Sequence, residues 1–79
     1  MGNLEVYVTA PPSVDVHPAR IYVDDIFVGN VSETLPVLYL KRGKHTIRVE
    51  LAGMKTYEQA ITILGEPNHQ FLDVSMEKK

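Results

Sequence analysis

Histidine and carboxylate side chains are the first places to look for chemistry in this sequence. Asp15 and His17 are separated by one residue, so an extended strand would place a carboxylate and an imidazole on one side, as a metal site requires. The other two histidines, His45 and His69, lie far away and complete no metal-ligand spacing. We therefore interpret Asp15 and His17 as an exposed loop pair. His45 follows a glycine turn, and we expect its ring to bond to a turn carbonyl.

A second group of acidic residues could supply oxygen ligands for calcium. Asp24, Asp25 and Glu33 are the candidates, but calcium loops place several carboxylates at close and regular intervals. That pattern is missing from the sequence. We predict neither a metal site nor a cofactor.

Catalytic residue types are present, but they lack the neighbours that would activate them. The chain contains no cysteine, so a thiolate nucleophile is excluded. Ser13, Ser32 and Ser75 stand outside the glycine-flanked turn that exposes a nucleophilic serine. No acid pair is set in an apolar stretch that would suit general acid-base chemistry. We predict that the chain is not an enzyme and has no catalytic residue.

Basic residues gather at one place in the sequence. Lys41, Arg42 and Lys44 surround Gly43, so a turn there would carry three positive charges. Such a tip can contact phosphate, an anionic glycan or an acidic protein surface. Charged turns also arise from solubility and from the need to protect sheet edges, which is the plainer interpretation.

Two tyrosines fall on the polar positions of their expected strands. Tyr7 and Tyr22 could stack on a sugar ring or anchor a neighbouring protein. Cross-strand aromatic packing on a solvated face is the alternative. Together with the basic tip they form the candidate interaction surface, which is Tyr7, Tyr22, Lys41, Arg42 and Lys44.

Length and charge narrow the classes of protein further. Seventy-nine residues are expected to form one domain, residues 1–79. A formal net charge of −2 argues against nucleic-acid binding, which depends on an excess of lysine and arginine. The first residues show no signal peptide, and no apolar run approaches the roughly 18 residues of a membrane span.

Apolar residues alternate along seven short stretches, which predicts seven half-buried β-strands. The clearest block is residues 35–63, where turns centred on Gly43 and Gly53 separate three strands, with Gly43 expected at a hairpin tip. Asp24 and Asp25 are expected to close a further tight hairpin. The sequence therefore predicts an all-β fold, a small antiparallel β-sandwich. The expected strands cover residues 4–8, 19–23, 26–28, 38–40, 47–51, 61–63 and 72–76.

These elements resemble the PEGA domain, a short all-β module of bacterial and archaeal surface and envelope proteins. The strongest piece is the block Leu38-x-Leu40-x-x-Gly43-x-His45-x-Ile47-x-Val49, and weaker matches extend over almost the whole chain. The chain differs in having Asp25 where the family usually has a turn glycine. The resemblance implies a prealbumin-like or Ig-like sandwich at a cell surface or envelope, with no catalytic residues to carry over.

We therefore expect a non-catalytic structural or interaction module within a larger assembly. Its partners would be proteins, including copies of itself. The alternative is a carbohydrate- or cell-wall-binding module that uses the exposed tyrosines. We expect no nucleic-acid partner and no membrane insertion.

Overall fold

The computed structural model describes residues 1–31, 37–65 and 69–79, and this part of the chain contains seven β-strands and no helix. The prediction of an all-β fold with about seven strands is confirmed. The strands are β1 (Gly2–Thr9), β2 (Arg20–Val23), β3 (Ile26–Asn30), β4 (Val37–Leu40), β5 (Gly43–Glu50), β6 (Tyr57–Ile63) and β7 (His69–Ser75).

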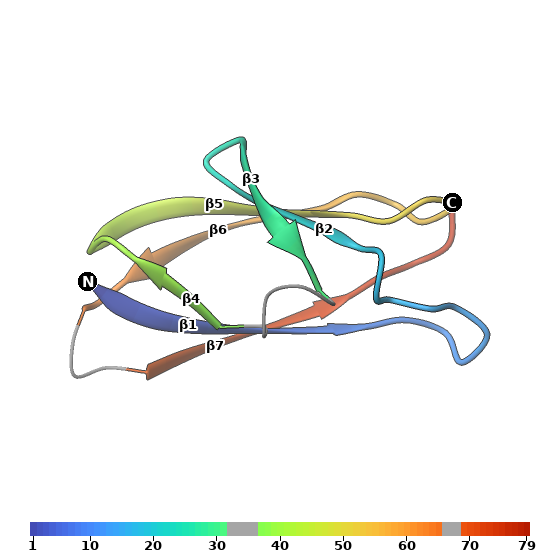
Figure 1. Cartoon of the computed structure of the whole chain (residues 1–79), viewed down its shortest axis with the longest axis horizontal. Coiled ribbons are helices and arrows are strands. Elements are labelled where there is room, and N and C mark those ends of the chain that lie inside the picture. Colours follow the sequence, from blue (N-terminus) through green and yellow to red (C-terminus); the bar gives the residue numbers. More distant parts are fainter. Residues whose placement is uncertain (32–36, 66–68) are drawn as a thin grey trace.

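The strands form two sheets that lie as layers one over the other (Figure 1). One sheet has three strands in the order β4-β1-β7, and the other has four in the order β3-β2-β5-β6. The hairpin of β2 and β3 protrudes from the body of the domain, so that β3 crosses the other strands at an angle (Figure 1). The arrangement is a small β-sandwich, as the alternating pattern indicated.

The pairing of β1 with β7 departs from the expected antiparallel arrangement. These strands run parallel, in a register from Asn3 opposite His69 to Thr9 opposite Ser75, whereas the other strand pairs are antiparallel. Side chains alternate with a period of two in both kinds of pair, so the sequence pattern does not distinguish them. Parallel strands need a long connection, and here the rest of the domain supplies it.

The hairpin expected at Gly43 is wrong. β4 pairs with β1, while β5 pairs with β2 and β6, so the connection through Lys41 and Arg42 passes from one sheet to the other. Gly43 is the first residue of β5, with a φ of 123° that favours glycine. Apolar alternation on both sides of the turn is equally compatible with strands that face each other across the core, which is the arrangement here.

The core lies between the sheets and is made by the inward residues of nearly every strand. Ile21 and Val23 point inward on β2, as predicted, while Arg20 and Tyr22 point outward. Each aliphatic side chain that is fully buried stabilises the fold by about 1.5–3 kcal/mol. The buried apolar residues are Leu4, Val6, Ala19, Ile21, Val23, Leu38, Ile47, Val49, Met54, Ile63, Val74 and Met76.

The tight hairpin expected at Asp24 and Asp25 is present. Both residues have positive φ, 51° and 66°, as a two-residue turn that matches the twist of its strands requires. A positive φ is unfavourable for residues other than glycine. At Asp24 this cost is offset by a hydrogen bond of 2.9 Å, which the Thr46 backbone N–H donates to Asp24 Oδ1. Between Phe27 and Gly29 the register shifts, leaving Val28 as a β-bulge.

The position of the core gives a first prediction. Ile47→Ala removes a fully buried side chain at the centre of the sandwich, and we expect it to lower the free energy of unfolding by about 2–5 kcal/mol, measured by urea denaturation. The matched control is Ile26→Ala, where the side chain is 68% exposed and the change should stay within about 0.5 kcal/mol. Equal losses in the two variants would contradict the placement of the core.

Candidate functional site

On the outer face of the three-stranded sheet, large apolar side chains are exposed on β4 and β7, the two strands that flank β1. On one side of β1, Val37 and Tyr39 of β4 lie opposite Glu5 and Asn3, respectively. On the other side, Phe71 of β7 lies opposite Glu5. The side chains of Tyr39 and Phe71 are more than half exposed, at 54% and 59%. We call Tyr7, Val37, Tyr39, His69 and Phe71 the aromatic face.

Ring contacts organise part of this face. The rings of Tyr7 and Phe71 are nearly parallel, with centroids 6.1 Å apart, and His69 meets Phe71 edge-on at 5.1 Å. The hydroxyl of Tyr7 donates a hydrogen bond to Glu5, which raises the pKa of Tyr7. The contacts preorganise Tyr7 and Phe71 while leaving much of their surface in water.

Tyr22 lies on the other sheet. Its ring packs at 5.6 Å against Phe27 of β3, and the guanidinium of Arg48 lies 4.2 Å from the ring centroid. Outward side chains of the two sheets point in opposite directions, so no single flat ligand can contact both Tyr7 and Tyr22. Each tyrosine therefore belongs to a separate surface.

The contacts of Arg48 with Asp25, Glu50 and Tyr22 were not predicted from the sequence. Its Nη1 lies 2.6 Å from Asp25 Oδ1, and its Nε lies 3.2 Å from Glu50 Oε2 without forming a hydrogen bond. Together with the cation–π contact to Tyr22, these interactions hold the β2–β3 turn against β5. Alternation places Arg48 and Glu50 on the outer face, but only strand order shows that Tyr22 and Asp25 are their neighbours.

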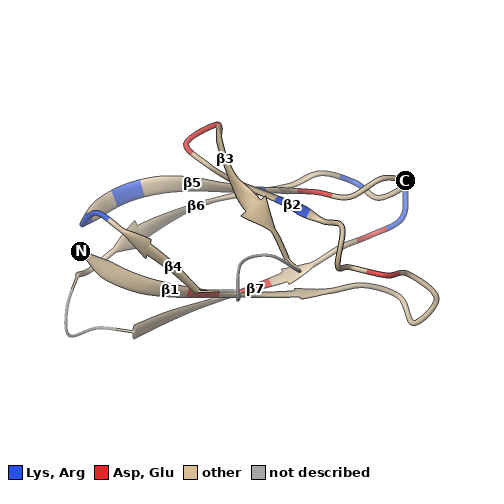
Figure 2. Cartoon of the chain, viewed as in Figure 1, with Lys and Arg blue, Asp and Glu red and all other residues tan. Residues whose placement is uncertain are grey.

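The basic tip spans the connection between β4 and β5 and the start of β5, at the end of the molecule where the N-terminus lies (Figure 2). Lys41, Arg42 and Lys44 are exposed, and no ion pair joins them to any residue that the structure describes. Tyr22 belongs to a different element, β2. Its role as a contact site stays a prediction.

His45 forms a specific link beside this tip. Its Nε2 lies 2.7 Å from the carbonyl oxygen of Lys41, and its Nδ1 lies 2.6 Å from Asp24 Oδ2. A carbonyl and an ionised carboxylate can only accept hydrogen bonds, so both ring nitrogens act as donors when the ring is protonated. The expected bond to a turn carbonyl is confirmed. The ring also connects the β2–β3 turn to the segment that crosses between the sheets.

Asp24 and His45 shift each other's protonation. The bond to Asp24 is the largest cause of the raised pKa of His45, followed by the bond to the Lys41 carbonyl. Hydrogen bonds from the Thr46 N–H and then from His45 lower the pKa of Asp24. Each member of the pair therefore favours the ionised form of the other.

The remaining acidic and histidine candidates do not converge. Asp15 and His17 pair with each other on the surface, with Oδ1 and Nδ1 2.6 Å apart, and the backbone bond from His17 lowers the pKa of Asp15. Glu33 and Ser32 lie outside the described residues. Within the described ranges, no group of three or more metal-ligating side chains occurs.

Comparison with known proteins supports the family indicated by the sequence. The sequence model of the PEGA domain family matches residues 4–78, which is nearly the whole chain. No match was found among the curated proteins. In the part of the chain that the structure covers, there is no helix of the length and apolarity that a membrane crossing needs.

The His45 link predicts a pH dependence of stability. Because folding raises the pKa of His45, its contribution is complete below the unfolded pKa of about 6.5 and is lost as the pH rises through the folded value. The contribution of Asp24 has the opposite pH dependence: it is complete above the unfolded pKa of 3.8 and is lost as the pH falls through the lowered folded value. We expect the free energy of unfolding to decline above neutrality in the wild type and much less in His45→Gln.

His17→Gln is the matched control, because His17 is exposed and its one ion pair among the described residues is with its neighbour Asp15. Urea denaturation across the pH range should show the wild-type decline in this variant. If the free energy of unfolding declined alike in His45→Gln and His17→Gln, the hydrogen bonds of His45 would not be the cause of the decline.

Proposed function

The chain belongs to the PEGA domain family, and on that premise we propose that it acts as a non-catalytic interaction module within a larger surface assembly. In this proposal the aromatic face docks against a protein partner, and the partner is a second copy of the chain. The four-stranded sheet remains exposed on the other side.

The single observation that carries the proposal is the exposure of large apolar side chains on one sheet face. Tyr39 and Phe71 are more than half exposed, and Tyr7 and Val37 are 44% and 40% exposed. Strand register places them in neighbouring rows on the same side of the sheet. Aromatic residues held in this way are the residue types that dominate binding energy in protein interfaces.

The rigidity of the face also favours docking. Tyr7 and Phe71 sit on adjacent strands and contact each other, and His69 packs against Phe71. Preorganised side chains lose less conformational freedom on binding than mobile ones, so more of the contact energy appears as affinity. A small domain with a fixed aromatic face can therefore bind without any large structural change.

The test is self-association of the 79-residue chain. We expect the wild type to associate reversibly in sedimentation equilibrium experiments as its concentration is raised. Phe71→Ser and Tyr39→Ser should each weaken this association by about tenfold or more, the usual effect of removing an aromatic anchor.

Ile26→Ser serves as the control, because Ile26 is more exposed than Phe71 but lies on β3 of the other sheet. It should leave the association unchanged. A wild-type chain that stays monomeric at millimolar concentration would overturn docking between copies, and so would equal weakening by Ile26→Ser.

A further inference from the structure

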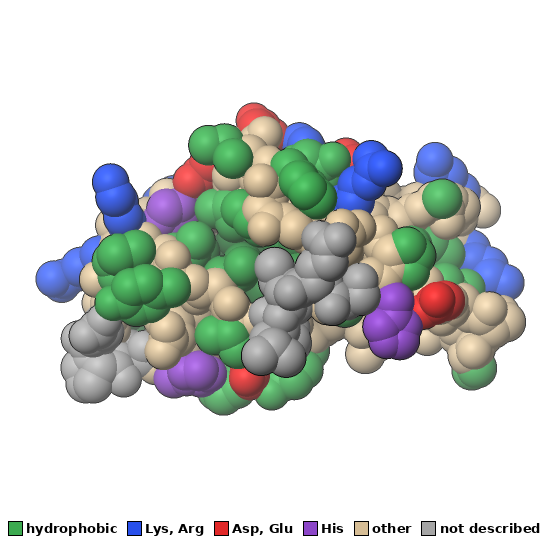
Figure 3. Space-filling model, in the orientation of Figure 1, with side chains coloured by type: hydrophobic (Ala, Val, Ile, Leu, Met, Phe, Trp, Pro, Cys, Tyr) green, Lys and Arg blue, Asp and Glu red, His purple; other side chains and the backbone are tan. Residues whose placement is uncertain are grey.

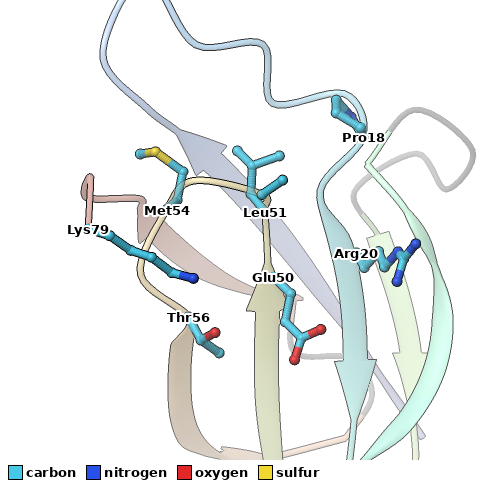
Figure 4. A pocket seen from close by; sticks show the side chains of 8 residues that line it. Pro18, Arg20, Glu50, Leu51, Met54, Thr56 and Lys79 are labelled. Atoms are coloured by element: carbon cyan, nitrogen blue, oxygen red, sulfur yellow. The ribbon is translucent and has the colours of Figure 1, made fainter.

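Two shallow hollows lie on the outside of the four-stranded sheet, away from the aromatic face, and they share Arg20. One has a volume of about 390 Å³ and is lined by Arg20, Tyr22, Phe27 and Asn30. The other, of about 440 Å³, lies at the end of β5 and includes Arg20, Glu50, Thr56 and Lys79, with Met54 and Leu51 as apolar lining (Figure 4).

The hollows follow one line across the strands. Arg20 is paired in register with Asn30 of β3 on one side and with Glu50 of β5 on the other. Thr56 directly precedes Tyr57, the partner of Val49, so it lies beside Glu50 at the start of β6. Asn30, Arg20, Glu50 and Thr56 therefore form one row across the four-stranded sheet. An extended ligand lying across the sheet would meet both hollows in succession.

The guanidinium of Arg20 has no ion-pair partner among the residues that the structure describes. The carboxylates of Asp25 and Glu50 are both engaged by Arg48. Neither Arg20 nor Lys79 has an ion pair with any described residue. Figure 4 shows the Arg20 guanidinium pointing away from Glu50, and Lys79 reaching across the β5–β6 connection.

Aromatic side chains line the same hollow as Arg20. Phe27 is half exposed and packs against Tyr22, one face of which Arg48 covers. Exposed hydrophobic side chains are visible over the protruding β2–β3 hairpin (Figure 3). A ring of this kind can pack against the apolar C–H face of a pyranose while neighbouring polar groups bind its hydroxyls.

We propose that this row binds an acidic polysaccharide through its uronic acid units. Arg20 binds the carboxylate of one unit with two parallel hydrogen bonds, and Phe27 packs against the sugar ring. The adjoining unit lies over the second hollow, where Thr56 and Lys79 donate hydrogen bonds and Glu50 accepts them from hydroxyls. An acidic peptide would satisfy Arg20 and Lys79, but it would bring carboxylates beside Glu50 without hydroxyl donors.

The experiment is an NMR titration of the 79-residue chain, labelled with ¹⁵N, with a short oligogalacturonate. We expect shifts to concentrate at Arg20, Phe27 and Thr56, and binding to weaken as salt is added. Arg20→Gln should weaken binding by about tenfold or more, since it removes a charge-assisted pair. Phe27→Ala should weaken it several-fold through lost ring contact.

Three controls make the result decisive. Arg42→Gln removes an exposed arginine on the β4–β5 connection, away from the row, and should bind like the wild type. The same oligosaccharide with its carboxylates reduced should bind at least tenfold more weakly. Phe71→Ser should also bind normally, so that failure of this proposal is distinguishable from failure of docking through the aromatic face.

Several outcomes would overturn the proposal. They are the absence of shifts at millimolar oligogalacturonate, equal binding of the reduced sugar, and wild-type affinity in Arg20→Gln. A short polyglutamate that binds as tightly as the sugar would show that the row recognises acidic chains in general rather than uronic acids.

Discussion

The burial of two apolar sheet faces against each other is the constraint on which the rest of this domain depends. The chain has no cysteine and, in its described part, no helix, so neither a disulfide nor a helical layer adds to this core. Leu4, Ile21, Ile47 and Ile63 come from four different strands and are fully buried. In a domain this small each such residue accounts for a sizeable part of the net stability. The inward positions are therefore committed to packing, and binding is left to the outward ones.

Polar contacts then determine how the chain passes between the layers. The segment after β4 leaves one sheet and enters the other, and His45 bonds to the carbonyl of Lys41 within that segment. The same ring bonds to Asp24, whose backbone is held in the left-handed region. One imidazole thus secures both a strained turn and the crossing point. This gives a physical reason for a histidine in the Gly43-x-His45 pattern, which the alternation of apolar residues does not supply.

The two outer faces differ in chemistry because different strands supply them. On the three-stranded sheet, exposed rings and Val37 surround Glu5, which suits a protein surface. On the four-stranded sheet, Arg48 pairs with its acidic neighbours, and Arg20 lies beside an exposed ring with no ion pair to any described residue. Under the two proposals, one face would join a protein assembly and the other would bind an anionic polymer. That combination suits the surface-associated character of the PEGA family.

Local patterns in the sequence were enough to predict the strands, the residues that face inward and the tight turn at Asp24 and Asp25, because alternation and turn chemistry are local properties. They did not determine which strands are neighbours. The parallel pair of β1 and β7 and the separation of β4 from β5 depend on contacts between distant segments. The close approach of Gly2 to Gly65 also depends on contacts between distant segments. A Cβ on Gly2 would lie 3.0 Å from the backbone of Gly65, so the site favours glycine. Tertiary structure alone decided which outward side chains share a face, because side-chain period is identical in every possible strand order.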